Sequence, residues 1–141
     1  MTRITSLLKW FEIPAFDFDR AVNFYSNVFN VEIERYNFNG EPHGVFSTGT
    51  GSVSGAIVKS EKENFDHSGP VLYFSAETDM SSVTEKILES GGKIVKPKTL
   101  IKNVIQEGVA IVPKNLIDNQ VGYFAMFLDS EGNKMALYSN S

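Results

Sequence analysis

The stretch that decides the fold is residues 7–29, LLKWFEIPAFDFDRAVNFYSNVF. Its first half is rich in large apolar and aromatic residues and is typical of a strand. Alternation along a strand places Trp10 and Glu12 on one face. Asp17 is a good helix N-cap, and apolar residues then recur at helical spacing as far as Phe29. We therefore expect a strand, a capped turn and an amphipathic helix with one buried face.

The same pattern returns in the second half of the chain. Asp79 is a second N-cap, and the apolar stripe behind it stops at a pair of glycines, Gly91 and Gly92. An offset of 62 residues relates Asp17 to Asp79, Asn30 to Gly92 and Trp10 to Leu72. The repeat predicts an α+β fold of two tandem βαβββ modules, at about 6–60 and 69–141, within one domain spanning 1–141. Joining them would close a cavity whose walls come from both modules.

Composition narrows the classes of partner. The chain has 13 basic and 17 acidic residues, a net charge of −4 and no basic run, which argues against binding to nucleic acid or to a membrane surface. Without cysteine it has neither disulfides nor thiolate metal sites. The apolar run near the N-terminus is too short for a signal peptide or a membrane span. We expect a cytoplasmic protein.

The second module is longer than the first between Thr99 and Gln120. Long irregular connections in compact domains are uncommon and are often functional. This segment is a flap over the cavity, a surface for a second subunit, or a plain loop.

Three stretches together resemble the vicinal oxygen chelate superfamily, which includes glyoxalase I, bleomycin-resistance proteins and extradiol dioxygenases. They are 13–25 (IPAFDFDRAVNFY), the repeat from 78 to 92, and the closing 127–134 (FLDSEGNK). The resemblance implies that the paired modules form a U-shaped mixed sheet around a central active site, with the helices outside. Drug-sequestering relatives are dimers with shared pockets, so it also implies a homodimer.

Metal-dependent members of that superfamily take His or Glu ligands from four strand positions. In register, these positions hold Trp10, Leu72, Ala136 and either Ala56 or Ile57. None of these side chains offers the imidazole or carboxylate that a divalent metal needs. We therefore expect no metal and no other cofactor.

Glu12 is the polar residue best placed for chemistry. On the expected cavity face its carboxylate would be a general base or a partner for a cationic ligand; the alternative is a structural ion pair. The residues expected to contact a small-molecule ligand are Trp10, Glu12, Leu72, Phe74, Ala136 and Tyr138. For the aromatic members a plain core role is the alternative. His43, in an expected turn, and His67, in the polar connection, are interpreted as surface residues.

Two functions follow from these expectations. The first is a metal-independent protein that binds a small organic molecule in the inter-module cavity. The second is a lyase or isomerase related to glyoxalase I, using Glu12 or an unrecognised metal site.

Overall fold

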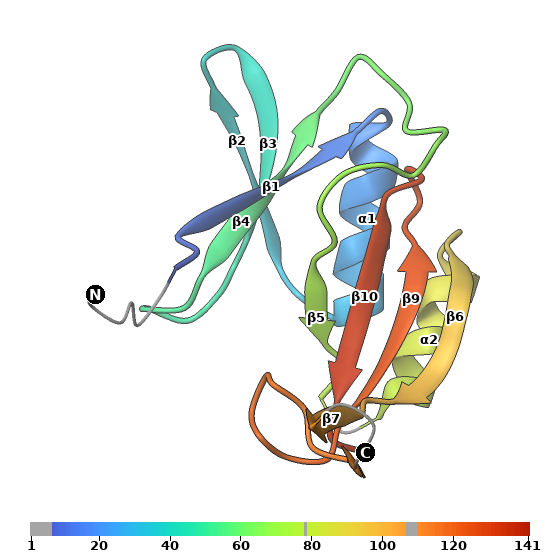
Figure 1. Ribbon diagram of the computed structural model, residues 1–141. Coiled ribbons are helices and arrows are strands. Elements are labelled where there is room, and N and C mark those ends of the chain that lie inside the picture. The colour runs from blue at the N-terminus through green and yellow to red at the C-terminus, as the bar shows by residue number, and fades with distance from the viewer. Residues whose placement is uncertain (1–6, 78, 107–109) are drawn as a thin grey trace.

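The computed structural model describes residues 7–77, 79–106 and 110–141 and has two βαβββ modules, which confirms the α+β class (Figure 1). The first module consists of β1 (Trp10–Ala15), α1 (Phe18–Phe29), β2 (Ile33–Phe38), β3 (Glu41–Phe46) and β4 (Ser54–Lys59). The second consists of β5 (Tyr73–Ser75), α2 (Met80–Glu89), β6 (Lys93–Leu100), β9 (Tyr123–Leu128) and β10 (Lys134–Ser139). A hairpin of β7 (Asn103–Gln106) and β8 (Ala110–Val112) is inserted between β6 and β9.

The helix boundaries follow from their capping residues. The Asp17 carboxylate accepts a hydrogen bond from the Arg20 backbone N–H at 3.0 Å, and Asn30 ends α1 in the left-handed conformation with φ 50°. Asp79 caps α2 in the same way through the Ser82 N–H at 3.1 Å, and Gly91 with φ 95° follows its end. Both caps confirm the expectation from sequence.

Each module contributes one four-stranded sheet. Sheet A has the order β1-β4-β3-β2 and sheet B the order β5-β10-β9-β6. Within each, the first-named pair is parallel and the others are antiparallel. We call inner the face of each sheet that packs on the helices and outer the opposite face. Figure 1 shows sheet A extending away from sheet B, with both helices behind sheet B.

The core lies between the inner faces and is unusually aromatic. Tyr25 on α1 lies 5.7 Å from Phe46 of sheet A and 5.8 Å from Phe74 of sheet B, measured between ring centroids. Phe24 on the same helix lies 6.3 Å from Phe127. Such edge-on and tilted contacts are the favoured geometries for aromatic pairs. Helix α1 therefore joins the two modules.

The turn between β9 and β10 strengthens this junction. The Glu131 carboxylate accepts hydrogen bonds from the Asp17 backbone N–H at 2.7 Å and from Arg20 Nε at 2.7 Å and Nη2 at 3.1 Å. Its side chain is 1% exposed. A carboxylate from the second module thus helps to hold the start of α1 in the first.

Asp129 makes a second buried link in the same turn. Its carboxylate accepts a hydrogen bond from the Tyr25 hydroxyl at 2.6 Å and from the backbone N–H groups of Glu131 and Asn133. Burial raises the pKa of Asp129 above its usual value, although these donors oppose the shift. Burial, with the neighbouring Asp129 charge, raises the pKa of Tyr25 well above its usual value. The turn between β9 and β10 is therefore a polar clamp between the two modules.

Two other expectations need correction. His43 was expected in a turn but lies on β3, which begins at Glu41. The segment 99–120 was expected to be irregular, but it contains the end of β6 and the β7–β8 hairpin.

No helix within the described ranges is long and apolar enough to cross a membrane.

Candidate functional site

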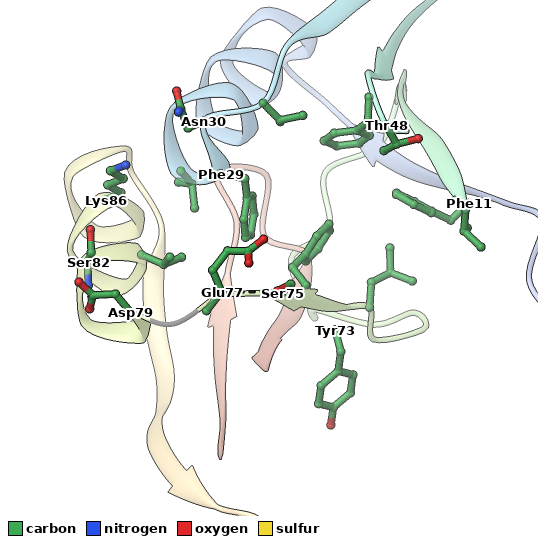
Figure 2. A pocket seen from close by; sticks show the side chains of 18 of the residues that line it. Phe11, Phe29, Asn30, Thr48, Tyr73, Ser75, Glu77, Asp79, Ser82 and Lys86 are labelled. Carbon is green, nitrogen blue, oxygen red and sulfur yellow. Dashed lines mark hydrogen bonds between the residues drawn. The ribbon is translucent and has the colours of Figure 1, made fainter. Parts of the chain in front are cut away.

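A pocket of about 880 Å³ opens between the two modules on the inner side of the sheets. One wall of the pocket comes from β1, β3 and the loop that follows β3 in the chain. The other wall comes from β5 and the start of α2. The end of α1 lies between them (Figure 2). The pocket therefore exists only because both modules are present in one chain.

Phenylalanine rings form the floor of this pocket. Phe29 and Phe74 lie 4.8 Å apart between ring centroids, and Phe11 lies 5.7 Å from Phe46 and 6.4 Å from Phe74. The four rings come from α1, β5, β1 and β3. They make a continuous apolar surface suited to a planar or aliphatic group.

Polar groups gather at one end of the pocket. Figure 2 shows Glu77 beneath Phe29, with Asp79 and Lys86 beside it on the α2 side. Glu77 has a positive φ of 56°, a conformation that costs a non-glycine residue energy. Its backbone N–H donates to the Ser75 hydroxyl at 3.1 Å. The pocket thus combines an apolar floor with a charged end.

Only part of the expected ligand-binding set lines this pocket. Leu72 and Phe74 do. Trp10 and Glu12 lie on the outer face of sheet A, and Ala136 and Tyr138 on the outer face of sheet B. The six residues do not surround one space within the chain.

A one-residue slip in the repeat places Leu72 and Phe74 on the inner face, while Trp10 and Glu12 lie on a different sheet from Ala136 and Tyr138. Strand β1 buries odd-numbered residues such as Ile13 and Ala15, whereas in the second module the even-numbered Phe74 and Ala76 face the core. An offset of 62 holds for the helix caps but not for the strands. The left-handed residue Glu77 lies in this longer strand-to-helix connection. The face on which a strand residue of the first module lies therefore does not predict the face of the residue 62 positions later.

The outer face of sheet A carries a second cluster, which sequence reasoning found only in part. The Trp10 indole N–H donates to Glu12 Oε2 at 3.2 Å, as their shared face predicted. His43 Nε2 lies 3.8 Å from the same oxygen, and its Nδ1 lies 2.9 Å from the Glu41 carbonyl oxygen. The Phe38 ring and the imidazole form an edge-to-face pair with centroids 5.0 Å apart. Extending the strand alternation back from Val45 would have found His43.

Tyr138 is engaged by the loop that follows β8. Its hydroxyl donates to Asp118 at 2.6 Å and accepts from Asn115 and Asn140, each at 2.9 Å. Desolvation, together with the hydrogen bond to Asp118, raises the pKa of Tyr138 above its usual value. The same hydrogen bond lowers the pKa of Asp118. Tyr138 therefore anchors this part of the 99–120 segment.

Comparison with known proteins identifies the family. The family model for the Glyoxalase/Bleomycin resistance protein/Dioxygenase superfamily matches residues 7–137. The chain belongs to this superfamily. A search of curated proteins finds no match.

Solved structures of other members of the fold are similar over nearly the whole chain. The fosfomycin resistance protein FosX from Listeria monocytogenes, complexed with Mn(II) and sulfate, is 12% identical with a TM-score of 0.64, covering 99% of this chain and 95% of its own. A glyoxylase/bleomycin resistance protein/dioxygenase domain from Frankia sp. EAN1pec is 14% identical with a TM-score of 0.67, covering 99% and 94%. Hypothetical protein SA1046 from S. aureus is 17% identical with a TM-score of 0.61, covering 98% and 95%. At these identities the likeness shows the fold alone.

The strand positions tested for metal ligands do not suit a metal. Trp10 and Ala56 lie on the outer face of sheet A, and Ala136 lies on that of sheet B. None has an oxygen or imidazole donor on its side chain. The described residues contain no group of three or more His, Asp or Glu side chains that could hold a metal ion. The side chains at these strand positions therefore do not fit a divalent metal.

Proposed function

We propose that this superfamily member binds a small, largely apolar organic molecule in the inter-module pocket. The observation that carries the proposal is the floor of four phenylalanine rings contributed by both modules, in a pocket of about 880 Å³. That volume lies within the range of small-molecule sites, which are mostly apolar with a few polar groups. Binding of this kind needs shape and burial and does not need a metal.

The charged end of the pocket would orient the ligand. Glu77 lines the pocket near the ring of Phe29, and Lys86 lines it from the α2 side. An apolar body would lie on the rings while a polar substituent meets these charges. The ligand class is therefore amphipathic, with one polar end.

The test uses the neutral fluorophore N-phenyl-1-naphthylamine as a probe of the pocket. We expect saturable binding with one site per chain. Val53 lines the pocket and is 36% exposed, so Val53→Glu places a carboxylate at an apolar wall without disturbing the core. A bound apolar ligand would take this carboxylate out of water without a partner, which is unfavourable by more than about 1.4 kcal/mol, so the Kd should rise at least about tenfold.

The matched control is Val95→Glu. Val95 is 50% exposed on β6 and does not line the pocket, so this variant adds the same charge elsewhere. Its Kd for the fluorophore should equal that of the wild type. Equal affinities for all three proteins would contradict binding in this pocket.

A second candidate function rests on the outer cluster. Glu12 Oε2 is held by the Trp10 indole and faces His43 at 3.8 Å, while the Glu12 side chain is 53% exposed and open to a substrate. A carboxylate beside an imidazole is a suitable acid–base pair for a lyase or isomerase. The function would be proton transfer at a carbon next to a carbonyl group.

Deuterium exchange tests this candidate. Hydroxyacetone in D₂O would exchange its carbon-bound protons faster with the protein than with buffer, followed by proton NMR. Glu12→Gln should abolish the acceleration, and His67→Gln, at a histidine outside the cluster, should preserve it. A stoichiometric divalent ion in protein purified without chelator would assign the chemistry to a metal instead.

A further inference from the structure

The polar end of the inner pocket contains a carboxylate that the protein itself does not engage. Glu77, Asp79 and Lys86 bring charge to this pocket. The Glu77 backbone N–H donates to the Ser75 hydroxyl, but no described residue donates a hydrogen bond to the Glu77 carboxylate or forms an ion pair with it. A carboxylate in this position beside an apolar surface is suited to a cationic partner.

Asp79 and Lys86, in contrast, already have roles in helix α2. The Asp79 carboxylate accepts the Ser82 N–H at 3.1 Å as the N-cap. Lys86 lies in the last turn of α2, where the negative end of the helix dipole stabilises a cation. Figure 2 shows both side chains on the α2 side, whereas the Glu77 side chain lies beneath Phe29. Glu77 therefore determines the charge next to the phenylalanine floor.

The backbone of Glu77 also sets this residue apart. Its φ of 56° is in the left-handed region, which glycine adopts at no steric cost and asparagine tolerates better than glutamate does. A residue kept in an unfavourable backbone conformation is often found at a functional site. We therefore expect that the side chain of Glu77, and not its backbone, is what this position requires.

The aromatic rings beside Glu77 favour the same sign of charge on a ligand. Phe29 and Phe74 are half-buried, line the pocket and lie 4.8 Å apart between ring centroids. The face of an aromatic ring attracts a cation through its quadrupole, and alkylated ammonium groups are bound in this way. The net charge of −4 adds a long-range attraction for cations. Carboxylate and rings thus select a cation together.

We propose that the ligand of this pocket is an organic ammonium ion with an apolar tail, and that Glu77 selects its charge. The tail would lie on the phenylalanine floor, with the ammonium group against the Glu77 carboxylate and the ring of Phe29. This inference rests on the proposed function, because a charge preference requires that the pocket binds a ligand. It adds the sign of the ligand's charge, which the apolar floor alone does not determine.

Three ligands with the same alkyl chain test the charge preference. Decyltrimethylammonium, decanol and decanoate are positive, neutral and negative, and each is titrated against bound N-phenyl-1-naphthylamine at low salt, where charge interactions are least screened. For the wild type, the Kd of decyltrimethylammonium should be at least about tenfold lower than that of decanoate. Decanol should bind with an intermediate Kd.

Two substitutions of Glu77 assign the preference to its carboxylate. Glu77→Gln keeps the size of the side chain and removes its charge, so the ratio of the decanoate Kd to the decyltrimethylammonium Kd should fall at least about fivefold. The decanol Kd reports any general change in the pocket. Glu77→Gly should lose the same preference and raise the Tm, because glycine suits the positive φ.

The matched control is Glu89→Gln. Glu89 is exposed on α2 and does not line the pocket, so this variant removes the same charge elsewhere and should keep the wild-type ratio. All variants should keep the wild-type circular dichroism spectrum.

The possible failures are distinguishable. If the fluorophore binds but neither Glu77 variant lowers the ratio, the charge preference is wrong and the pocket stands. A wild type that prefers decanoate would assign the polar end to Lys86 and would also overturn the inference. A wild type that does not bind the fluorophore would overturn the proposed function and this inference with it.

Discussion

Glu131→Gln should destabilise the whole protein although it removes only a charge from a hairpin turn. The carboxylate is 1% exposed and accepts hydrogen bonds from Asp17 and from two nitrogens of Arg20, all in the other module. Glutamine has nearly the same shape but keeps one acceptor oxygen, which can serve the Asp17 N–H. Arg20 Nη2 donates to the same oxygen as Asp17, so the amide nitrogen would replace the oxygen that accepts from Arg20 Nε. The variant therefore loses the charge-assisted contact from Arg20 Nε to the other module without leaving a cavity.

The magnitude follows from what each partner can recover. The Arg20 side chain is 53% exposed, so its guanidinium can return to water at little cost. What remains is the loss of about one charge-assisted hydrogen bond in a buried setting, or about 2 kcal/mol. For a chain of this size that corresponds to a fall in Tm of about 6–10 °C.

Urea unfolding followed by circular dichroism and by fluorescence of the only tryptophan, Trp10 on β1, measures this loss. The matched control is Asp19→Asn. Asp19 pairs with Arg35 at 2.6 Å, but their side chains are 76% and 53% exposed, so this loss should be under about 1 kcal/mol and vanish in high salt. Equal effects of the two variants, or a loss below about 1 kcal/mol for Glu131→Gln, would refute the assignment of Glu131 as an inter-module clamp.

Three further variants test the other structural assignments. Burial raises the pKa of Asp129, so the folded state holds the carboxyl proton more tightly than the unfolded chain does. The free energy of unfolding of the wild type, measured by urea titration relative to that of Asp129→Asn, should therefore increase as the pH falls from 7 towards 4. Gly55→Ala puts a Cβ 2.4 Å from a backbone oxygen of β1 and should cost more than about 2 kcal/mol, whereas Gly49→Ala, with its nearest neighbour at 3.9 Å, should cost under about 0.5 kcal/mol in the same assay. Tyr138→Phe releases Asp118 and should speed amide hydrogen exchange at 117–120 about tenfold, with exchange in α1 unchanged.

The sequence predicts local structure here because the decisive signals are short-range. Asp17 and Asp79 cap their helices as expected, and Asn30 ends α1, since a cap depends on a side chain and the next three or four backbone groups. Asn39 and Gly40, an Asn-Gly pair typical of turns, both have positive φ between β2 and β3. The order of strands and helices in the two βαβββ modules follows from these cap and turn residues.

Which residues line the site depends on whether the odd or the even positions of each strand face inward, and this is not decided by short-range signals. One additional residue before Asp79 moves Phe74 to the inner face, away from Ala136 and Tyr138. A one-residue change in register reverses every side chain of a strand, so a slip too small to alter the fold places Leu72 and Phe74 on the face opposite to Ala136 and Tyr138. His43 was misplaced for a related reason, because Pro42 and Gly44 beside it are usual in turns and hid the strand.

Alternation along β1 also separates the two candidate functions. Phe11 points inward to the phenylalanine floor of the pocket, and Glu12, the next residue, points outward to Trp10 and His43. Changing Phe11 therefore alters the apolar pocket and leaves the acid–base cluster in place, whereas changing Glu12 does the opposite. Since both substitutions affect the same strand, any general loss of β1 would appear in both. A ligand or substrate that responds to only one of them identifies the side of sheet A on which this superfamily member works.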